Sequence, residues 1–219
     1  MTLVEVLVVI VVLAVVEAIF LSRLARSRIH MGPNCISNLK QIGLAYRLWE
    51  GDNNDKYPMF VSVTNGGAME LTATGNVAAC FQVMFNELST PKILVCPGDK
   101  EHVMAADFGA AFTSKNISYF VGLDVTNEIN PQMLLSGDDN FAADGVPVKS
   151  GLVQFSTNSN VAWTSGRHVP YKEHFWTPTR GKFYGNIGLA DGSVQIVTTE
   201  GLQNALRQTG VATNRLAIP

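Results

Sequence analysis

The first 21 residues constrain this chain more than any other feature. They read MTLVEVLVVIVVLAVVEAIFL, and only Thr2, Glu5 and Glu17 among them are polar. A helix of this length extends about 30 Å, which matches the hydrocarbon thickness of a bilayer. A carboxylate inside such a run costs about 2.5–3.5 kcal/mol at mid-bilayer and less near an end. We therefore expect a membrane-inserted helix over residues 1–21 in which Glu5 has a partner.

Three interpretations of this stretch compete. A cleavable signal peptide needs basic residues before the apolar run and a small-residue cleavage site after it. The first basic residue is Arg23, which follows the run, and no A-x-A pattern precedes the polar sequence. A simple single-pass anchor explains the length of the run but leaves Thr2 and Glu5 without a reason. A third interpretation accounts for both residues.

The segment Met1–Ile10 resembles the mature N-terminus of type IV pilins and type II secretion pseudopilins. Those chains usually begin with Phe, followed by Thr-Leu-x-Glu and an apolar helix; Thr2 and Glu5 are in register, and Met1 replaces the Phe. The resemblance implies that a prepilin peptidase removes a leader before Met1 and that the new α-amino group is N-methylated. It also implies that Glu5 neutralises the α-amino group of an adjacent subunit, since a buried charge needs a partner.

Several later segments are similar to pilin-like proteins that carry the processing-associated H-x9-DG domain. The longest reads CISNLKQIGLAYRLWEGDNNDKYP, and the others are 86–97, 118–124, 135–138 and 185–194. One departure is clear: Gly181 stands ten residues before Asp191, where that group has its His, while His168 and His174 are out of register. Any role tied to that His is therefore not implied for this chain.

The resemblance and the sequence pattern together predict an α+β, pilin-like lollipop. We expect a long N-terminal helix over residues 1–56, kinked near Gly32-Pro33, with Asn34 as a new N-cap and an end at 51–55. Residues 1–21 are its membrane or filament-core segment. Residues 57–219 are expected to form a globular, mostly antiparallel β head.

Within the head, apolar periodicity predicts the individual elements. Residues 77–88 have the spacing of a helix, and 201–206 are expected to form a short closing helix. Asp191-Gly192 between two alternating runs predicts a β-hairpin over 185–197. The other expected strands are short apolar runs at 93–95, 117–121, 133–135 and 161–163.

Three cysteines, Cys35, Cys80 and Cys96, allow one disulfide and suit an oxidising compartment. Cys35 and Cys96 are the two that the resembling group also carries. The resemblance therefore implies a Cys35–Cys96 bridge that ties the helix to the head and leaves Cys80 free. A Cys80–Cys96 bridge is the alternative.

Little in the sequence indicates catalysis or a cofactor. The histidines are scattered and no G-x-S-x-G motif occurs, so we expect no enzyme. A net charge of −2 and a pI near 6.1 give no nucleic-acid signature. Asp138 and Asp139 are the candidates for a calcium site, because hard cations take clustered oxygen ligands, but no D-x-D-x-D-G spacing accompanies them. A solvated turn explains these two residues equally well.

The predicted function is structural. We expect a subunit that polymerises through its N-terminal hydrophobic helix into a type IV pilus-like or pseudopilus filament. Its partners would be further copies of itself in a helical homopolymer, the prepilin peptidase, the assembly machinery, and the membrane before assembly. The expected location is the inner membrane, followed by a cell-surface filament or a periplasmic pseudopilus. The alternative is a minor pseudopilin or a membrane-anchored binding module that forms no filament alone.

Overall fold

The computed structural model describes residues 5, 12–13, 16, 31–164, 167 and 183–219. The chain divides into two compact units, Met1–His30 and Met31–Pro219, and we call the second unit the head. In the first unit the four described residues, among them Glu5, are helical. Met1 and Thr2 lie outside the described residues, as do Gly181, His168 and His174.

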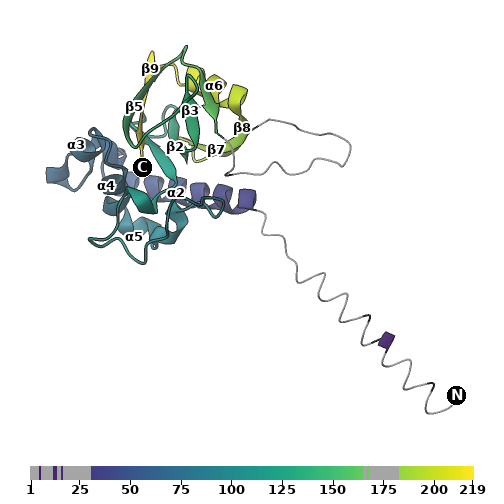
Figure 1. The fold of residues 1–219 in the computed structure, drawn as a ribbon. Helices are drawn as coiled ribbons and strands as arrows, with labels where there is room; N and C mark the ends of the chain where they lie inside the picture. Colours follow the sequence, from purple (N-terminus) through teal and green to yellow (C-terminus); the bar gives the residue numbers. More distant parts are fainter. Residues whose placement is uncertain (1–4, 6–11, 14–15, 17–30, 165–166, 168–182) are drawn as a thin grey trace. The chain divides into compact units, whose positions relative to one another are not determined.

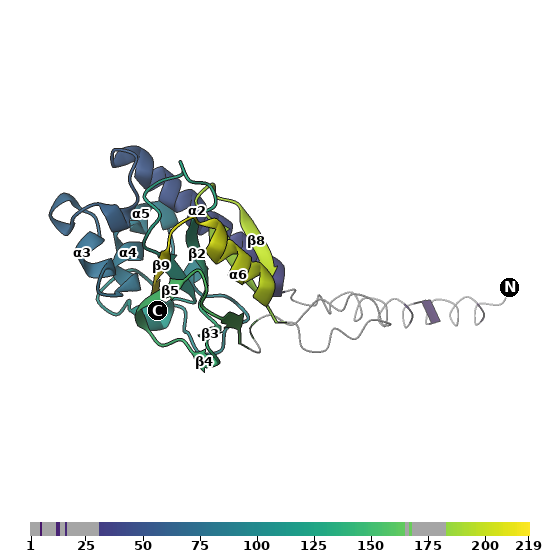
Figure 2. The ribbon, with the colours of Figure 1, turned by 90° about the horizontal axis from the view of Figure 1, so that it is seen from above.

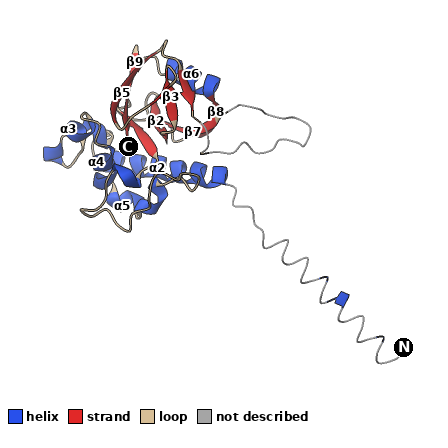
Figure 3. Cartoon of the chain, in the orientation of Figure 1, coloured by secondary structure: helices blue, strands red, loops and turns tan. Residues whose placement is uncertain are grey.

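The centre of the head is a six-stranded antiparallel sheet with the strand order β5-β9-β1-β2-β7-β8 (Figures 1 and 3). Strands β3, β4 and β6 form a second, three-stranded antiparallel sheet. The strands are β1 (Tyr119–Gly122), β2 (Leu134–Asp138), β3 (Phe141–Ala143), β4 (Val146–Pro147), β5 (Gly151–Ser156), β6 (Val161–Trp163), β7 (Tyr184–Leu189), β8 (Val194–Thr198) and β9 (Thr213–Ile218).

The described helices of the head are mostly short. α2 (Met31–Asp52) is the longest, and α6 (Thr199–Gln208) is the next. The remaining α-helices are α3 (Met69–Thr72), α4 (Val77–Val83) and α5 (Phe85–Leu88). Four 3-10 turns connect them to the sheet: η1 (Pro58–Phe60), η2 (Val63–Asn65), η3 (Pro91–Leu94) and η4 (Ser114–Asn116).

The large sheet separates two hydrophobic clusters, because successive side chains of a strand point to opposite faces. Tyr119 and Val121 of β1 belong to one cluster with α2 and α4, whereas Phe120 between them belongs to the other. That second cluster also holds Leu202 and Leu206 of α6. The head is thus layered, with α2–α5 on one face of the sheet and α6 with the small sheet on the other (Figures 1 and 2).

α2 is amphipathic and belongs to the head rather than to a separate stalk. Its inner face buries Leu39, Ile42, Tyr46 and Trp49 in the first cluster at helical spacing. The Tyr46 ring contacts Phe81 of α4 edge-on, which fixes the helix against its neighbours. α2 therefore packs against the rest of the head through this buried face.

The expected long N-terminal helix is wrong, although the α+β class and the mostly antiparallel sheet are correct. Among the described residues the longest helix is α2, with 22 residues. Its polar residues, such as Asn38 and Lys40, interrupt any apolar run, because α2 is built to have one buried and one solvated face. The helical stretch expected over residues 1–56 is therefore not one continuous apolar rod.

The prediction of an inner-membrane anchor is also wrong. Over the described ranges, no helix is at once long enough and apolar enough to cross a bilayer. A spanning helix needs about 20 predominantly apolar residues, and the solvated face of α2 prevents this.

Several local expectations differ from the structure for identifiable reasons. Asn34 is inside α2 rather than its N-cap, and Pro33 lies in the first turn, where a missing N–H needs no partner. The helix expected over 77–88 is split into α4 and α5 at Met84. The strand expected over 93–95 is mostly the 3-10 turn η3, which Pro91 begins. The 185–197 hairpin is confirmed as β7 and β8, and the closing helix is confirmed as α6.

Candidate functional site

The outward face of α2 is the first feature with a functional aspect. Opposite the buried face, the exposed positions recur every three or four residues, at Ser37, Gln41, Leu44 and Leu48. Leu44 is 57% exposed and Leu48 is 53% exposed, although both are leucines on a helix that buries its other apolar residues. Residues four apart on a helix are neighbours, so the two leucines form one apolar strip, which we call the Leu44–Leu48 strip.

Cys35 of α2 and Cys96 form a disulfide that fastens the start of this helix to the segment after η3. Both cysteines are fully buried in the first cluster. Cys80 of α4 is a free, buried thiol whose sulfur lies 3.2 Å from the hydroxyl of Tyr46. Burial raises the pKa of the Cys80 thiol to about 12, so this cysteine stays protonated and unreactive at neutral pH.

The two calcium candidates at the end of β2 have different environments. Asp138 is fully buried, and its Oδ2 accepts hydrogen bonds from the backbone N–H and the side-chain amide of Asn186 on β7, at 2.6 and 2.9 Å. Asp139 instead contacts Arg167 and His102. Adjacent residues of an extended chain point to opposite sides, so these two carboxylates do not converge on one cation position.

Asp139 belongs to a cluster of four ionisable side chains that we call the Arg167 cluster: Asp99, His102, Asp139 and Arg167. Arg167 Nη2 lies 2.6 Å from Asp99 Oδ2, and Arg167 Nη1 contacts Asp139 Oδ1 and donates to the carbonyl of Ser118 at 3.0 Å. His102 Nδ1 lies 2.7 Å from the same Asp99 oxygen, and its Nε2 is 3.8 Å from Asp139 Oδ2. Each carboxylate thus contacts both cationic groups.

The backbone explains how these four groups meet. Asp99 and His102 lie three residues apart on the turn after Cys96, where the Asp99 N–H bonds to the Cys96 carbonyl. Asp139 follows β2, and its N–H bonds to the carbonyl of Ser118 just before β1. The Ser118 N–H also bonds to the Leu94 carbonyl, and the Ser118 hydroxyl accepts from the Cys96 N–H. Ser118 therefore holds the two segments together, and the guanidinium of Arg167 bonds both carboxylates.

Burial and charge together set the protonation of the Arg167 cluster. Burial alone would raise the pKa of Asp99, but the His102 hydrogen bond and the Arg167 charge hold it well below its ordinary value. Burial raises the pKa of Asp139 to about 6, against the attraction of Arg167. Burial would lower the pKa of His102, but its bond to Asp99 and the charge of Asp139 raise it. With His102 protonated, two carboxylates balance two cations.

This arrangement suits a structural ion-pair network better than a reactive centre. Asp99, His102 and Asp139 offer atoms within 4.8 Å of one another, a spacing that a metal ion could use. The guanidinium of Arg167, however, already bonds both carboxylates, and together with protonated His102 it balances their charge. His102 Nε2 faces Asp139 rather than a hydroxyl, so the described part of the chain supplies no nucleophile–base pair here.

Sequence reasoning located only part of these sites. Of the residues in the Arg167 cluster it singled out Asp139, and it missed Asp99, His102 and Arg167. The Asp99–His102 spacing of three is a local signal for a side-chain contact, whereas nothing in the sequence connects Arg167 to a turn more than sixty residues earlier. Glu5 is helical and exposed in the first unit.

Comparisons of the chain with protein-family models, with curated proteins and with solved structures find no match.

Proposed function

We propose that this chain is a structural subunit that polymerises into a filament of the type IV pilin or pseudopilin kind. Its N-terminal apolar segment would pack against the same segment of neighbouring copies, with Glu5 setting the axial register by pairing with a neighbour's α-amine. The order of Thr2, Glu5 and a long, mostly apolar run in the first segment supports this proposal.

The observation that carries the proposal furthest is the Leu44–Leu48 strip. A helix that buries Ile42, Tyr46 and Trp49 has no packing reason within the head to place two leucines on its opposite face. Exposed apolar groups that lie together typically mark a surface that another protein covers. A neighbouring subunit in a helical polymer would cover this strip, because each copy meets the next through a repeated surface.

The disulfide independently supports an oxidising compartment, which a filament outside the cytosol requires. Disulfides persist in oxidising environments and are rare in the cytosol. Cys35–Cys96 fastens the very helix that carries the strip. It would hold the assembly face in a fixed position on the head while neighbouring copies pack against it.

Electron cryomicroscopy of the full chain, with mass spectrometry of its N-terminus, tests this function. We expect helical filaments whose chains begin at an N-methylated Met1, and we expect a Leu44→Asp/Leu48→Asp variant to form none. Val146→Asp is the matched control, because Val146 is 63% exposed on β4 of the small sheet and should leave filaments intact. A folded, monomeric wild-type chain, or normal filaments from the double variant, would overturn the proposal.

A further inference from the structure

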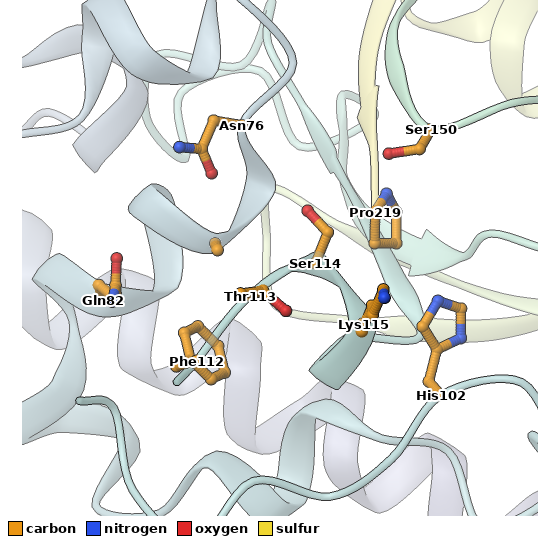
Figure 4. A pocket seen from close by; sticks show the side chains of 10 residues that line it. Asn76, Gln82, His102, Phe112, Thr113, Ser114, Lys115, Ser150 and Pro219 are labelled. Carbon is orange, nitrogen blue, oxygen red and sulfur yellow. The ribbon is translucent and has the colours of Figure 1, made fainter. Parts of the chain in front are cut away.

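A cleft of about 610 Å³ opens on the head beside His102 (Figure 4). It lies between α4, the turn that carries His102, the segment 112–115 with η4, the residue before β5 and the end of β9, so five separate segments line it. Small-molecule sites typically occupy about 300–1,000 Å³ and combine apolar lining with a few convergent polar groups. The volume of this cleft suits a ligand of two or three sugar rings.

The apolar part of the lining is the buried part. Phe112 is 4% exposed and Ala78 is 6% exposed, and Pro219 after β9 is also buried. These groups give the cleft an apolar floor. Both ring nitrogens of His102 face carboxylates of the Arg167 cluster, so His102 adds ring surface to the cleft rather than a free nitrogen.

The polar part of the lining consists of neutral amides and hydroxyls with unused hydrogen-bonding capacity. Asn76 uses its Oδ1 to accept from the Ala79 N–H, which leaves its amide N–H groups available. Gln82 uses its amide nitrogen to donate to the Phe108 carbonyl, which leaves its amide oxygen available. The hydroxyl of Ser114 lines the cleft beside them (Figure 4). The rim therefore offers donors and acceptors together.

Lys115 supplies the charge of the cleft. Its side chain is exposed at the rim and makes no ion pair with any residue in the described ranges. Among the described residues, no Asp or Glu side chain lines the cleft. A ligand with a negative group would meet the Lys115 ammonium at the rim.

We propose that this cleft binds a short saccharide that carries an acidic group, with Lys115 pairing to the carboxylate. Sugar hydroxyls both donate and accept, which matches the mixed amide and hydroxyl rim, and the C–H faces of a pyranose ring match the apolar floor. The inference does not depend on filament assembly and involves none of the residues of the Leu44–Leu48 strip.

Isothermal titration calorimetry of the full chain with trigalacturonate and with maltotriose tests the proposal. We expect saturable binding of trigalacturonate and at least about tenfold weaker binding of the uncharged maltotriose. Lys115→Gln should weaken trigalacturonate binding to about the level of maltotriose, while Lys92→Gln, a change at an exposed lysine of η3 outside the lining, should leave it unchanged. Equal binding of the two sugars, or unchanged binding by Lys115→Gln, would overturn the acidic-group assignment.

A second pair of variants tests whether the saccharide binds in this cleft, without removing a charge. Ser150→Trp places a large ring in the cleft mouth and should abolish binding of both sugars. Asn158→Trp adds the same ring at an exposed position between β5 and β6, outside the cleft, and should have no effect. Binding that survives Ser150→Trp in a folded protein, or the absence of any saturable binding by the wild type, would overturn the proposal.

Discussion

Arg167 Nη2 lies 2.6 Å from Asp99 Oδ2, and the two side chains are 6% and 1% exposed. The same guanidinium contacts Asp139 and the carbonyl of Ser118, so one side chain joins the turn after Cys96 to the ends of β1 and β2. Breaking a buried ion pair lowers the stability of a protein strongly, because removing one partner leaves an uncompensated charge away from water.

Arg167→Met should therefore lower the free energy of unfolding by about 3–5 kcal/mol. Arg215→Met is the matched control, because Arg215 pairs with Asp124 at 2.7 Å but is 48% exposed, and exposed pairs contribute at most about 1 kcal/mol. Urea denaturation followed by circular dichroism measures both. Equal losses in the two variants would show that the Arg167 cluster contributes no more than a surface pair.

His102 should make the stability depend on pH. Its pKa is raised in the folded chain, so its contribution is complete below its ordinary pKa near 6.5 and is lost as pH rises through the folded value. The groups that face it are Asp99, Asp139 and Arg167, and Asp139 titrates near pH 6. The stability difference between wild type and His102→Gln should therefore shrink as the pH rises above about 6.5 and through the raised pKa of His102. A difference that stays constant over this range would contradict the charge assignment of His102.

The Cys35–Cys96 bridge closes a loop with a sequence separation of 61 residues, which is long enough for a large entropic effect on the unfolded chain. Reduction should lower the free energy of unfolding by about 2–4 kcal/mol, measured as a shift in the urea midpoint. A Cys35→Ala/Cys96→Ala variant should be insensitive to reductant. Cys80→Ala should respond to reductant as the wild type does, because Cys80 is a free thiol. An unchanged wild-type midpoint on reduction would argue against the bridge.

Two glycines of β7 should respond to the same substitution to very different extents. A Cβ at Gly185 would lie 2.5 Å from ring carbons of the buried Trp163, whereas a Cβ at Gly188 would meet only the Ser136 carbonyl oxygen at 3.5 Å. Gly185→Ala should therefore lower the free energy of unfolding by about 1–3 kcal/mol, the usual range for overpacking. Gly188→Ala should change it by less than about 0.5 kcal/mol. Thermal denaturation of both variants measures the two changes in stability. Equal changes would contradict the packing of Gly185 against Trp163.

The sequence predicts those elements of the head whose signals are local. The β7–β8 hairpin follows from Asp191-Gly192, because Gly192 adopts a positive φ of 77° that its turn requires. The inner face of α2 follows from its helical period. The prediction of a strand at Ile93–Val95 is wrong, because a short apolar run has no distinct period. A 3-10 turn forms there instead, with Thr90 as its N-cap and Pro91 as its first residue.

Features that depend on distant contacts were outside the reach of the sequence. Arg167 bonds Asp99 and Asp139 across segments that are far apart in the sequence, and hydrogen bonds of Ser118 to Leu94 and Cys96 hold two of these segments together. The cleft beside His102 needs five segments that no local pattern connects. The sequence also predicted too long an N-terminal helix, because it joined the helical patterns on either side of Gly32-Pro33 into one element, although the second has polar residues such as Asn38 and Lys40 along its solvated face.

Glu5 gives the most direct test of the assembly proposal at the other end of the chain. Glu5→Gln keeps the shape and hydrogen-bonding capacity of the side chain but removes its charge, so it cannot neutralise a neighbour's α-amine. We expect it to abolish or shorten filaments, as counted by electron microscopy of equal amounts of protein, while the circular dichroism of the head stays unchanged. Glu17→Gln is the matched control, because it removes the other carboxylate of the apolar stretch and should leave filament length unaltered. Filaments of normal length from Glu5→Gln would mean that the register is set elsewhere, and the Leu44–Leu48 strip would then be the surface to test next.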